Sequence, residues 1–179
     1  MDKENRTNTS LIDNSNKNNN KQKKQNIMAT SVNPYLIFNG NCEEAFLFYK
    51  SVFGGEFPYI GKFKDMPASE DGGCAEFSEK DANRVMHVSL PIGKTILMGS
   101  DSNEQSGDVV FGGNFSVSIN VESTAEGDRV FNGLSAGGTV YMPMNKTFWG
   151  AYFGMFKDKF GVSWMVNFDE SEPHKEYNS

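Results

Sequence analysis

The chain of 179 residues is long enough for one domain or for two small units that share a core. Residues 1–31 carry six basic and three acidic side chains, so 11 of the 17 basic and 20 of the 23 acidic residues, a net charge of −9, fall in the remainder. Such an acidic remainder lacks the basic surface that a phosphate backbone requires, and no apolar run reaches the length of a membrane span. We therefore expect neither nucleic acid nor a membrane among the partners.

Residues 1–31 are predicted to form a disordered tail rich in Asn and Lys, followed by a domain over 32–170 and a second polar tail over 171–179. The first tail has eight Asn, no aromatic residue and only scattered apolar residues, so it buries too little surface to offset the entropy of ordering. It has no continuous apolar segment of the kind found in secretory signals. Its acidic residues also argue against a mitochondrial presequence.

The two cysteines, Cys42 and Cys74, form no CxxC motif and no Cys/His cluster. This usage is typical of a reducing compartment, so we expect a cytoplasmic protein. Cys42 falls at the start of a predicted helix, where a thiolate is favoured. It is therefore either a reactive thiol or a small buried side chain.

A first group of elements is predicted over the part of the chain that follows the tail. In chain order these are a strand (34–40), a helix (41–53), a strand (56–63), a long loop (64–80) and two strands (84–92 and 94–101). Asn41 and Glu44 have the spacing of a capping box, and Gly54 ends the helix pattern. Gly93 marks the turn between the last two strands.

The same order of elements recurs over 114–168. An offset of 83 residues aligns Leu36 with Ile119, and an offset of 68 then aligns Ile96 with Trp164. The difference of 15 residues corresponds to the long loop, which only the first copy contains. The sequence therefore predicts a β-α-β-β-β unit used twice.

The second copy contains the most aromatic stretch of the chain. Its helix is predicted to begin near Ser123, and its last two strands, within 147–167, are rich in aromatic residues and glycine around a hairpin turn at 157–161. Phe148 and Trp149 in this stretch either line a ligand cavity or pack into the core.

Each copy is predicted to have one apolar sheet face under its helix and one semi-polar face. In the first copy His87 lies on the semi-polar face with Val85, because strand side chains alternate. In the second copy Ser116 and Ser118 lie on the semi-polar face, opposite an apolar row that begins at Phe115. The two semi-polar faces are expected to enclose a small ligand together.

The chain resembles the PhnB-like branch of the vicinal oxygen chelate superfamily, which also holds glyoxalases, bleomycin-resistance proteins and extradiol dioxygenases. The matching segments are NPYLIFNGNCEEAFLFYKSVFGGE (33–56), VMHVSLPIGKTILMGSD (85–101) and AGGTVYMPMNKTFWGAYFGMFKDKFGVSWMVN (136–167). The resemblance implies an α+β fold in which two βαβββ modules, at about 33–101 and 114–168, form a curved mixed sheet. It also implies a homodimer.

The resemblance carries over less far to metal binding. Superfamily enzymes hold a divalent metal through His, Glu or Gln early in the first strand and in the last strand of each module. The matching neighbourhoods, 34–36, 97–98, 116–118 and 164–166, contain no imidazole and no carboxylate. Because a divalent ion needs several such ligands, His87 would be a ligand only if another group, such as Glu76, Asp101 or a partner chain, completed the site.

We therefore expect a small-molecule binding protein that works without a metal and holds its ligand in the concave sheet cavity. The candidate ligand contacts are His87, Asp101, Ser116, Ser118, Phe148 and Trp149. His87 is either an acid or base for the ligand or a hydrogen-bonded residue within the sheet. Asp101 is either the partner of His87 or a cap for the following turn.

Two enzymatic alternatives stay open. The first is a glyoxalase- or dioxygenase-type enzyme, for which a divalent metal is the implied cofactor. The second is a methyltransferase, a name used in the ubiquinone-pathway part of the resembled family. The sequence disfavours this alternative, because no glycine-rich loop follows the first strand as a nucleotide-type cofactor site requires.

Overall fold

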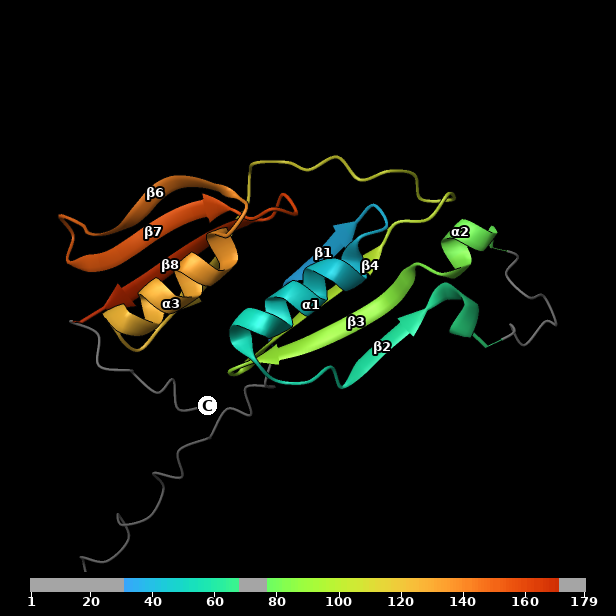
Figure 1. Cartoon of the computed structure of the whole chain (residues 1–179), viewed down its shortest axis with the longest axis horizontal. Coiled ribbons are helices and arrows are strands. Elements are labelled where there is room, and N and C mark those ends of the chain that lie inside the picture. Colours follow the sequence, from blue (N-terminus) through green and yellow to red (C-terminus); the bar gives the residue numbers. More distant parts are fainter. Residues whose placement is uncertain (1–30, 68–76, 171–179) are drawn as a thin grey trace, which may run out of the picture. The chain divides into compact units, whose positions relative to one another are not determined.

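A computed structural model describes residues 31–67 and 77–170, in which two modules follow each other along the chain (Figure 1). The first module contains β1 (Tyr35–Phe38), α1 (Cys42–Phe53), β2 (Tyr59–Lys62), the 3₁₀-helix η1 (Phe63–Asp65), α2 (Glu79–Ala82), β3 (Val85–Ile92) and β4 (Thr95–Asp101). The second contains β5 (Val117–Asn120), α3 (Thr124–Ser135), β6 (Thr139–Lys146), β7 (Ala151–Lys157) and β8 (Ser163–Asp169). The predicted tails, 1–31 and 171–179, lie outside these residues apart from Ser31.

The two modules have the same sheet topology. The strand order is β1-β4-β3-β2 in one four-stranded sheet and β5-β8-β7-β6 in the other. In each sheet the first and last strands of the module pair in parallel, and all other neighbours are antiparallel. A parallel pair needs a long crossover, which α1 and α3 supply. The α+β fold with a duplicated βαβββ unit is thus confirmed.

The modules differ in the connection between their second and third strands. In the first module η1, residues 68–76, which lie outside the described part, and α2 separate β2 from β3. In the second module four residues join β6 to β7. The long insertion predicted for the first copy alone is therefore confirmed.

The predicted alignment of the last strands is wrong by one residue. Leu36 and Ile119, which the first offset aligns, pair with Gly99 and Val166, so β4 and β8 are offset by 67 residues and not by 68. The turn from β7 to β8 is longer than the turn from β3 to β4. The offset of 68 aligns Gly93 with Gly161 in these turns, and the different turn lengths make that offset too large by one residue for the strands. A shift of one residue moves every side chain of a strand to the other face.

The two crossover helices begin in different ways. The N-cap of α1 is Asn41, but its side chain makes no capping hydrogen bond. Instead the Asp101 carboxylate, at the end of β4, accepts hydrogen bonds from the backbone N–H groups of Gly40 (2.8 Å) and Cys42 (3.0 Å). The predicted capping box of α1 is therefore wrong, and the acceptor at the start of this helix is a carboxylate from the sheet. At α3, Ser123 caps the helix as predicted.

The thiol of Cys42 lies in the core beside this carboxylate. Burial raises its pKa well above the ordinary value, and the nearby negative charge of Asp101 raises it further. A thiol that stays protonated is a poor nucleophile. The buried-side-chain interpretation of Cys42 is thus confirmed.

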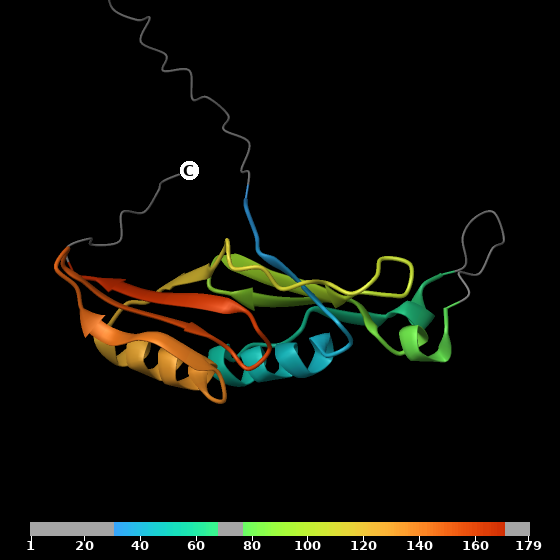
Figure 2. The ribbon, with the colours of Figure 1, turned by 90° about the horizontal axis from the view of Figure 1, so that it is seen from above.

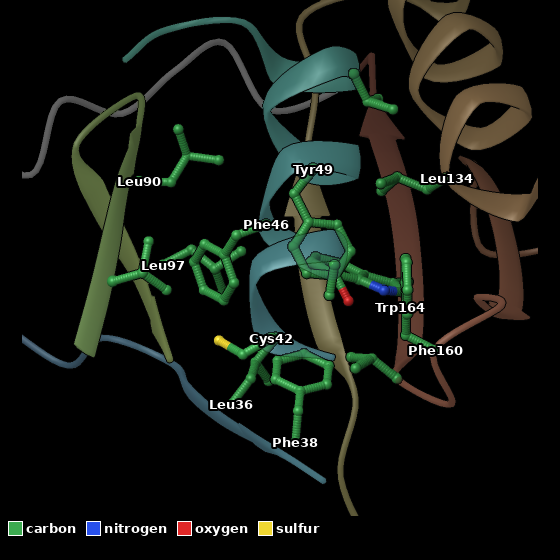
Figure 3. Packing of buried hydrophobic residues seen from close by; sticks show 14 of the residues in the cluster. Leu36, Phe38, Cys42, Phe46, Tyr49, Leu90, Leu97, Leu134, Phe160 and Trp164 are labelled. Carbon is green, nitrogen blue, oxygen red and sulfur yellow. The ribbon is translucent and has the colours of Figure 1, made fainter. Parts of the chain in front are cut away.

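A single hydrophobic core joins the two modules. Tyr49 of α1 and Trp164 of β8 meet there edge to face, with ring centroids 5.4 Å apart (Figure 3). Between them lies the buried Asp158, whose Oδ2 accepts hydrogen bonds from the Tyr49 hydroxyl and from Trp164 Nε1, both at 2.8 Å. Its Oδ1 accepts the backbone N–H groups of Phe160 and Val162. The turn at 157–161 is therefore also a connection between the modules.

Both crossover helices lie on the same side of the strands (Figure 2). They also contact each other. Each sheet has one face under a helix, and no helix of the described residues covers its other face. We call the two uncovered sheet faces together the open face. Among the helices of residues 31–67 and 77–170, none has the length and apolar character needed to cross a membrane.

Candidate functional site

The open face of the first sheet exposes large apolar side chains. In β1, Leu36 and Phe38 are buried under α1, whereas Tyr35 and Ile37 are 45% and 44% exposed on the opposite face. This follows from the alternation of strand side chains. A strand that is apolar on both faces indicates that something else covers the open one.

His87 lies on the open face between two tyrosines, as the sequence predicted for its face. Its ring centroid is 5.8 Å from that of Tyr35 and 5.9 Å from that of Tyr59, and the Tyr35 hydroxyl lies 3.4 Å from His87 Nδ1. We call these three residues the aromatic cluster. Tyr59 reaches His87 because Gly61, opposite His87 in β2, has no side chain; a Cβ on Gly61 would collide with the Tyr59 ring.

Val85 does not share the face of His87, contrary to the prediction. A register shift between Gly61 and Lys62 pairs Lys62 with Val85, so the alternation of β3 is interrupted there. Val85 is buried in the core, and its backbone N–H donates to Asp101 Oδ2 (2.9 Å).

Asp101 lies apart from the other predicted site residues. It is on the helix side of β4, buried, and both of its oxygens accept hydrogen bonds from backbone N–H groups. The side chain within hydrogen-bond distance of His87 Nδ1 is Tyr35. The geometry therefore gives Asp101 a role in holding α1, β3 and β4 together.

Ser118 belongs to β5, the edge strand of the second sheet, and Ser116 does not. Ser118 is exposed and pairs with Met165 of β8, while Ser116 directly precedes β5 and is half-buried. Val117 packs against the core on the other face, as predicted. Phe115 was expected to join that buried row, but it precedes the strand and is exposed.

Phe148 and Trp149 lie in the connection between β6 and β7, and not within a strand as predicted. Their rings meet edge to face at 4.8 Å, and they are 97% and 55% exposed. Trp149 also contacts Phe153, which lies on the open face of β7 (6.2 Å between ring centroids). The core-packing interpretation of Phe148 and Trp149 is therefore wrong.

A hollow of about 200 Å³ lies where the two modules meet. Its lining includes Tyr35 and Ile37 of β1, Phe111 and Phe115 of the linker between the modules, and Ser163 at the start of β8. We call it the junction hollow. Tyr35 therefore belongs both to this hollow and to the aromatic cluster.

The linker is fixed at this place by Asn39. The side-chain amide of Asn39 donates to the carbonyl oxygen of Val109 (3.0 Å), and its Oδ1 accepts the backbone N–H of Val109 (2.8 Å). Two hydrogen bonds of this kind hold the linker as a neighbouring strand would. Phe111 then packs close to Gly161, whose positive φ of 91° suits glycine.

Almost no charge lies on the open face of the described strands. Strand register and alternation place the following side chains there: Tyr35, Ile37, Tyr59, His87, Ser89, Pro91, Ile96, Met98, Ser100, Ser118, Asn120, Thr139, Met142, Asn145, Ala151, Phe153, Met155, Lys157, Ser163, Met165, Asn167 and Asp169. Lys157 and Asp169 are the charged members, and both lie at strand ends. A face of this composition in so acidic a chain favours neutral contacts.

The donor groups of this face do not fit a divalent metal ion. Among the residues that the structure describes, no three His, Cys, Asp or Glu side chains are grouped so as to hold one. His87 is surrounded by tyrosines, and hydroxyl and thioether groups make up most of the remaining polar atoms. Manganese and zinc sites take imidazole and carboxylate ligands in combination. Glu76, Cys74 and His174 lie outside the described residues.

A protein-family model described as 3-demethylubiquinone-9 3-methyltransferase matches residues 30–167. Protein YjdN of Escherichia coli K12 is 33% identical over 145 residues, which cover 79% of this chain and 97% of YjdN. Protein PA1353 of Pseudomonas aeruginosa is 42% identical with a TM-score of 0.69, covering 79% of this chain and 98% of that one. A Bacillus cereus PhnB protein, described as a putative 3-demethylubiquinone-9 3-methyltransferase, is 25% identical with a TM-score of 0.59, covering 78% and 99%.

The chain therefore belongs to this PhnB-like family. More distant solved structures share the fold alone. One is a fosfomycin resistance protein from Listeria monocytogenes, solved in complex with Mn(II), which is 11% identical with a TM-score of 0.53. The predicted resemblance and fold are confirmed.

Proposed function

We propose that this protein binds a small molecule on its open face and that a second copy of the chain encloses the ligand there. The observation that carries the proposal is the composition of the open face. It is nearly free of charge and keeps several large apolar side chains half exposed, such as Tyr35, Ile37 and Tyr59, in a chain that is otherwise acidic. Exposed apolar surface of this extent marks a binding site.

The area of the open face suits a homodimer. The eight strands hold 49 residues in total. With a rise of about 3.3 Å per residue and about 4.8 Å between strands, they present roughly 800 Å² on one side. A stable protein interface of standard size buries about 800 Å² on each partner. The junction hollow then leaves room for a ligand between the two copies.

The ligand contacts that we propose are the aromatic cluster, the junction hollow, Ser116, Ser118 and Trp149. His87 supplies the polar atom of the first module, and Trp149 supplies a stacking surface next to Phe153 of the second. Asp101 is not part of this proposal, because its carboxylate is buried and its hydrogen bonds are made to the backbone.

A protein that acts without a metal is favoured over the metal enzyme by the donor groups of the open face. A methyltransferase is disfavoured because β1 leads into α1 without a glycine-rich loop. The Asp101 carboxylate also fills the N-terminus of α1, which a nucleotide-type cofactor would need. Cysteine usage supports a cytoplasmic location.

Binding is tested with a thermal-shift panel of thiol conjugates, phosphonates, aromatic antibiotics and divalent metals, followed by calorimetry on each compound that stabilises the protein. We expect His87→Ala and Trp149→Ala to weaken binding of the hit about fivefold or more with little change in melting temperature. Leu47→Ala, on the exposed side of α1, is the matched control and retains the affinity.

Two results would contradict the proposal. One is a hit whose affinity is the same in the wild type and in both open-face variants, which would make His87 and Trp149 structural residues. The other is a stoichiometric metal ion in gently purified protein whose removal abolishes a reaction, which would support the enzyme alternative.

A further inference from the structure

Three methionines form a row across the open face of the second sheet. Met142 of β6 pairs with Met155 of β7, and Met155 pairs with Met165 of β8. Directly paired residues on neighbouring strands point to the same face with their Cβ atoms about 5 Å apart. All three side chains are half-buried. We call them the methionine row; Ser118 of β5 continues it at the edge of the sheet.

Thioethers have specific binding properties. Methionine is unbranched and flexible, so it adapts its shape to what lies on it, and its polarisable sulfur makes favourable contacts with aromatic rings. A sheet face that served only as packing surface would be expected to hold β-branched residues, which fit a pleated strand better. On this face of the second sheet the β-branched residue of the described strands is Thr139 at the start of β6, outside the row. The row is therefore suited to hold a flat, exchangeable occupant.

The side chains next to the methionine row indicate which class of ligand would fit there. Phe153, two residues before Met155 on the same face, contacts Trp149, so an aromatic wall stands at one side. Ser118 and Ser163 offer hydroxyl groups at the other side, where β5 and β8 pair. The charged side chains of this sheet face are Lys157, which pairs with Ser163, and Asp169, which pairs with Ala151 at the other end of β7. Their charges are opposite, so the face has no net charge to match that of an ionic ligand.

We propose that the ligand of the open face is a neutral, planar aromatic molecule with one hydroxyl or carbonyl group, and that its ring lies on the methionine row. The inference rests on the function proposed above and specifies its ligand class. The ring contacts the three thioethers and the edge of Phe153. The hydroxyl or carbonyl group forms its hydrogen bond with the serines next to β8.

The test uses the full-length protein labelled with carbon-13 at the methionine methyl groups and three matched probes. These are 1-naphthol, its charged analogue 1-naphthoate and its saturated analogue decahydro-1-naphthol. We expect 1-naphthol to shift the signals of Met142, Met155 and Met165 upfield in a saturable way, because the methyl groups lie over its ring. The signals of Met66 and Met144 stay in place, and the other two probes bind at least about tenfold more weakly.

Two variants separate the thioether contact from general packing. Met155→Leu keeps the volume and loses the sulfur, so we expect about two- to tenfold weaker binding of 1-naphthol without loss of stability. Met144→Leu is the control on the same sheet: Met144 lies on the opposite face of β6, packed against Gly127 and Gly154, and its substitution leaves the affinity unchanged.

Each outcome bears on the inference. Saturable shifts of the row with decahydro-1-naphthol or 1-naphthoate, at affinities equal to that of 1-naphthol, would overturn the aromatic and neutral class while supporting the binding function. Equal affinity of Met155→Leu and the wild type would overturn the role of the thioethers. If no probe shifted the row and the thermal-shift panel also gave no hit on the open face, both proposals would fail.

Discussion

The two modules share one topology but use their buried carboxylates differently. In the first module Asp101 bonds only to backbone N–H groups of its own module, at the start of α1 and of β3. In the second module Asp158 accepts a hydrogen bond from Tyr49, which belongs to the first. The two copies of the unit thus share their strand order but differ in the hydrogen bonds that their buried carboxylates make. One carboxylate organises a module, and the other joins the two.

The two modules also contribute different side chains to the open face. The first module presents the aromatic cluster around His87, with one titratable ring. The second presents the methionine row with serines at its edge. The imidazole of the proposed site belongs to the first module and its thioethers belong to the second. A ligand site that spans both modules therefore depends on the junction that Asp158 holds.

The largest effect is expected from Asp158→Ala. The substitution leaves the Tyr49 hydroxyl, the Trp164 indole N–H and two backbone N–H groups without their acceptor in the core. We expect the free energy of unfolding to fall by about 3–5 kcal/mol. Urea denaturation followed by Trp fluorescence measures this loss. A loss below about 1 kcal/mol would show that Asp158 does not hold the modules together.

A smaller effect is expected from Asp101→Ala, and a smaller one still from Ser123→Ala. Both substitutions remove a helix cap, but Asp101→Ala also leaves the backbone N–H of Val85 without an acceptor in the core. We expect a loss of about 2–3 kcal/mol for Asp101→Ala and about 1 kcal/mol for Ser123→Ala. Equal losses in urea denaturation would mean that the carboxylate acts as an ordinary cap.

Two tyrosines offer a matched pair for the connection between modules. The hydroxyl of Tyr49 donates to Asp158 and that of Tyr152 donates to Asp128, both at 2.8 Å, but only the first bond is fully buried and crosses between modules. We expect Tyr49→Phe to cost about 1.5–2 kcal/mol and Tyr152→Phe less than about 1 kcal/mol. Differential scanning calorimetry of the two variants ranks them, and the reverse order would contradict the comparison.

The smallest effect is a decline of stability at high pH. Burial and the neighbouring carboxylates raise the pKa values of Cys42 and Tyr49 in the folded protein. Their unfolded values are about 8.5 and 10, so on raising the pH the unfolded chain loses these protons first. The stability that both groups contribute is therefore fully present below about pH 8.5 and falls above it.

The pH effect is measured as the free energy of unfolding between pH 7 and pH 10.5. The double variant Cys42→Ala, Tyr49→Phe serves as the comparison, because it lacks both groups. We expect a shallower decline in the double variant than in the wild type. Parallel curves would show that other groups govern the alkaline decline.

Much of the open face was predictable from strand alternation. The pattern of β1 buries Leu36 and Phe38, so the exposure of Tyr35 follows from the sequence, whereas its contact with His87 depends on how β1 lies relative to β3. The helix-side position of Asp101 follows from the same rule applied to Leu97. Periodicity carries this information because each strand has only two faces.

Other features had no local signal in the sequence. The bulge that buries Val85 depends on the pairing of β2 with β3, and the longer turn before β8 changes the repeat offset by one. Asp158 meets Tyr49 across 109 residues of sequence. Contacts of this kind arise from how the modules pack, which composition and spacing do not encode.

The most direct test of the proposed function is sedimentation velocity of Met155→Glu. The substitution places a charge in the middle of the open face, and Leu47→Glu, which adds the same charge on the exposed side of α1, is its control. We predict that the wild type and Leu47→Glu sediment as dimers and that Met155→Glu sediments as a folded monomer. A dimer of Met155→Glu as stable as that of the wild type would contradict the account.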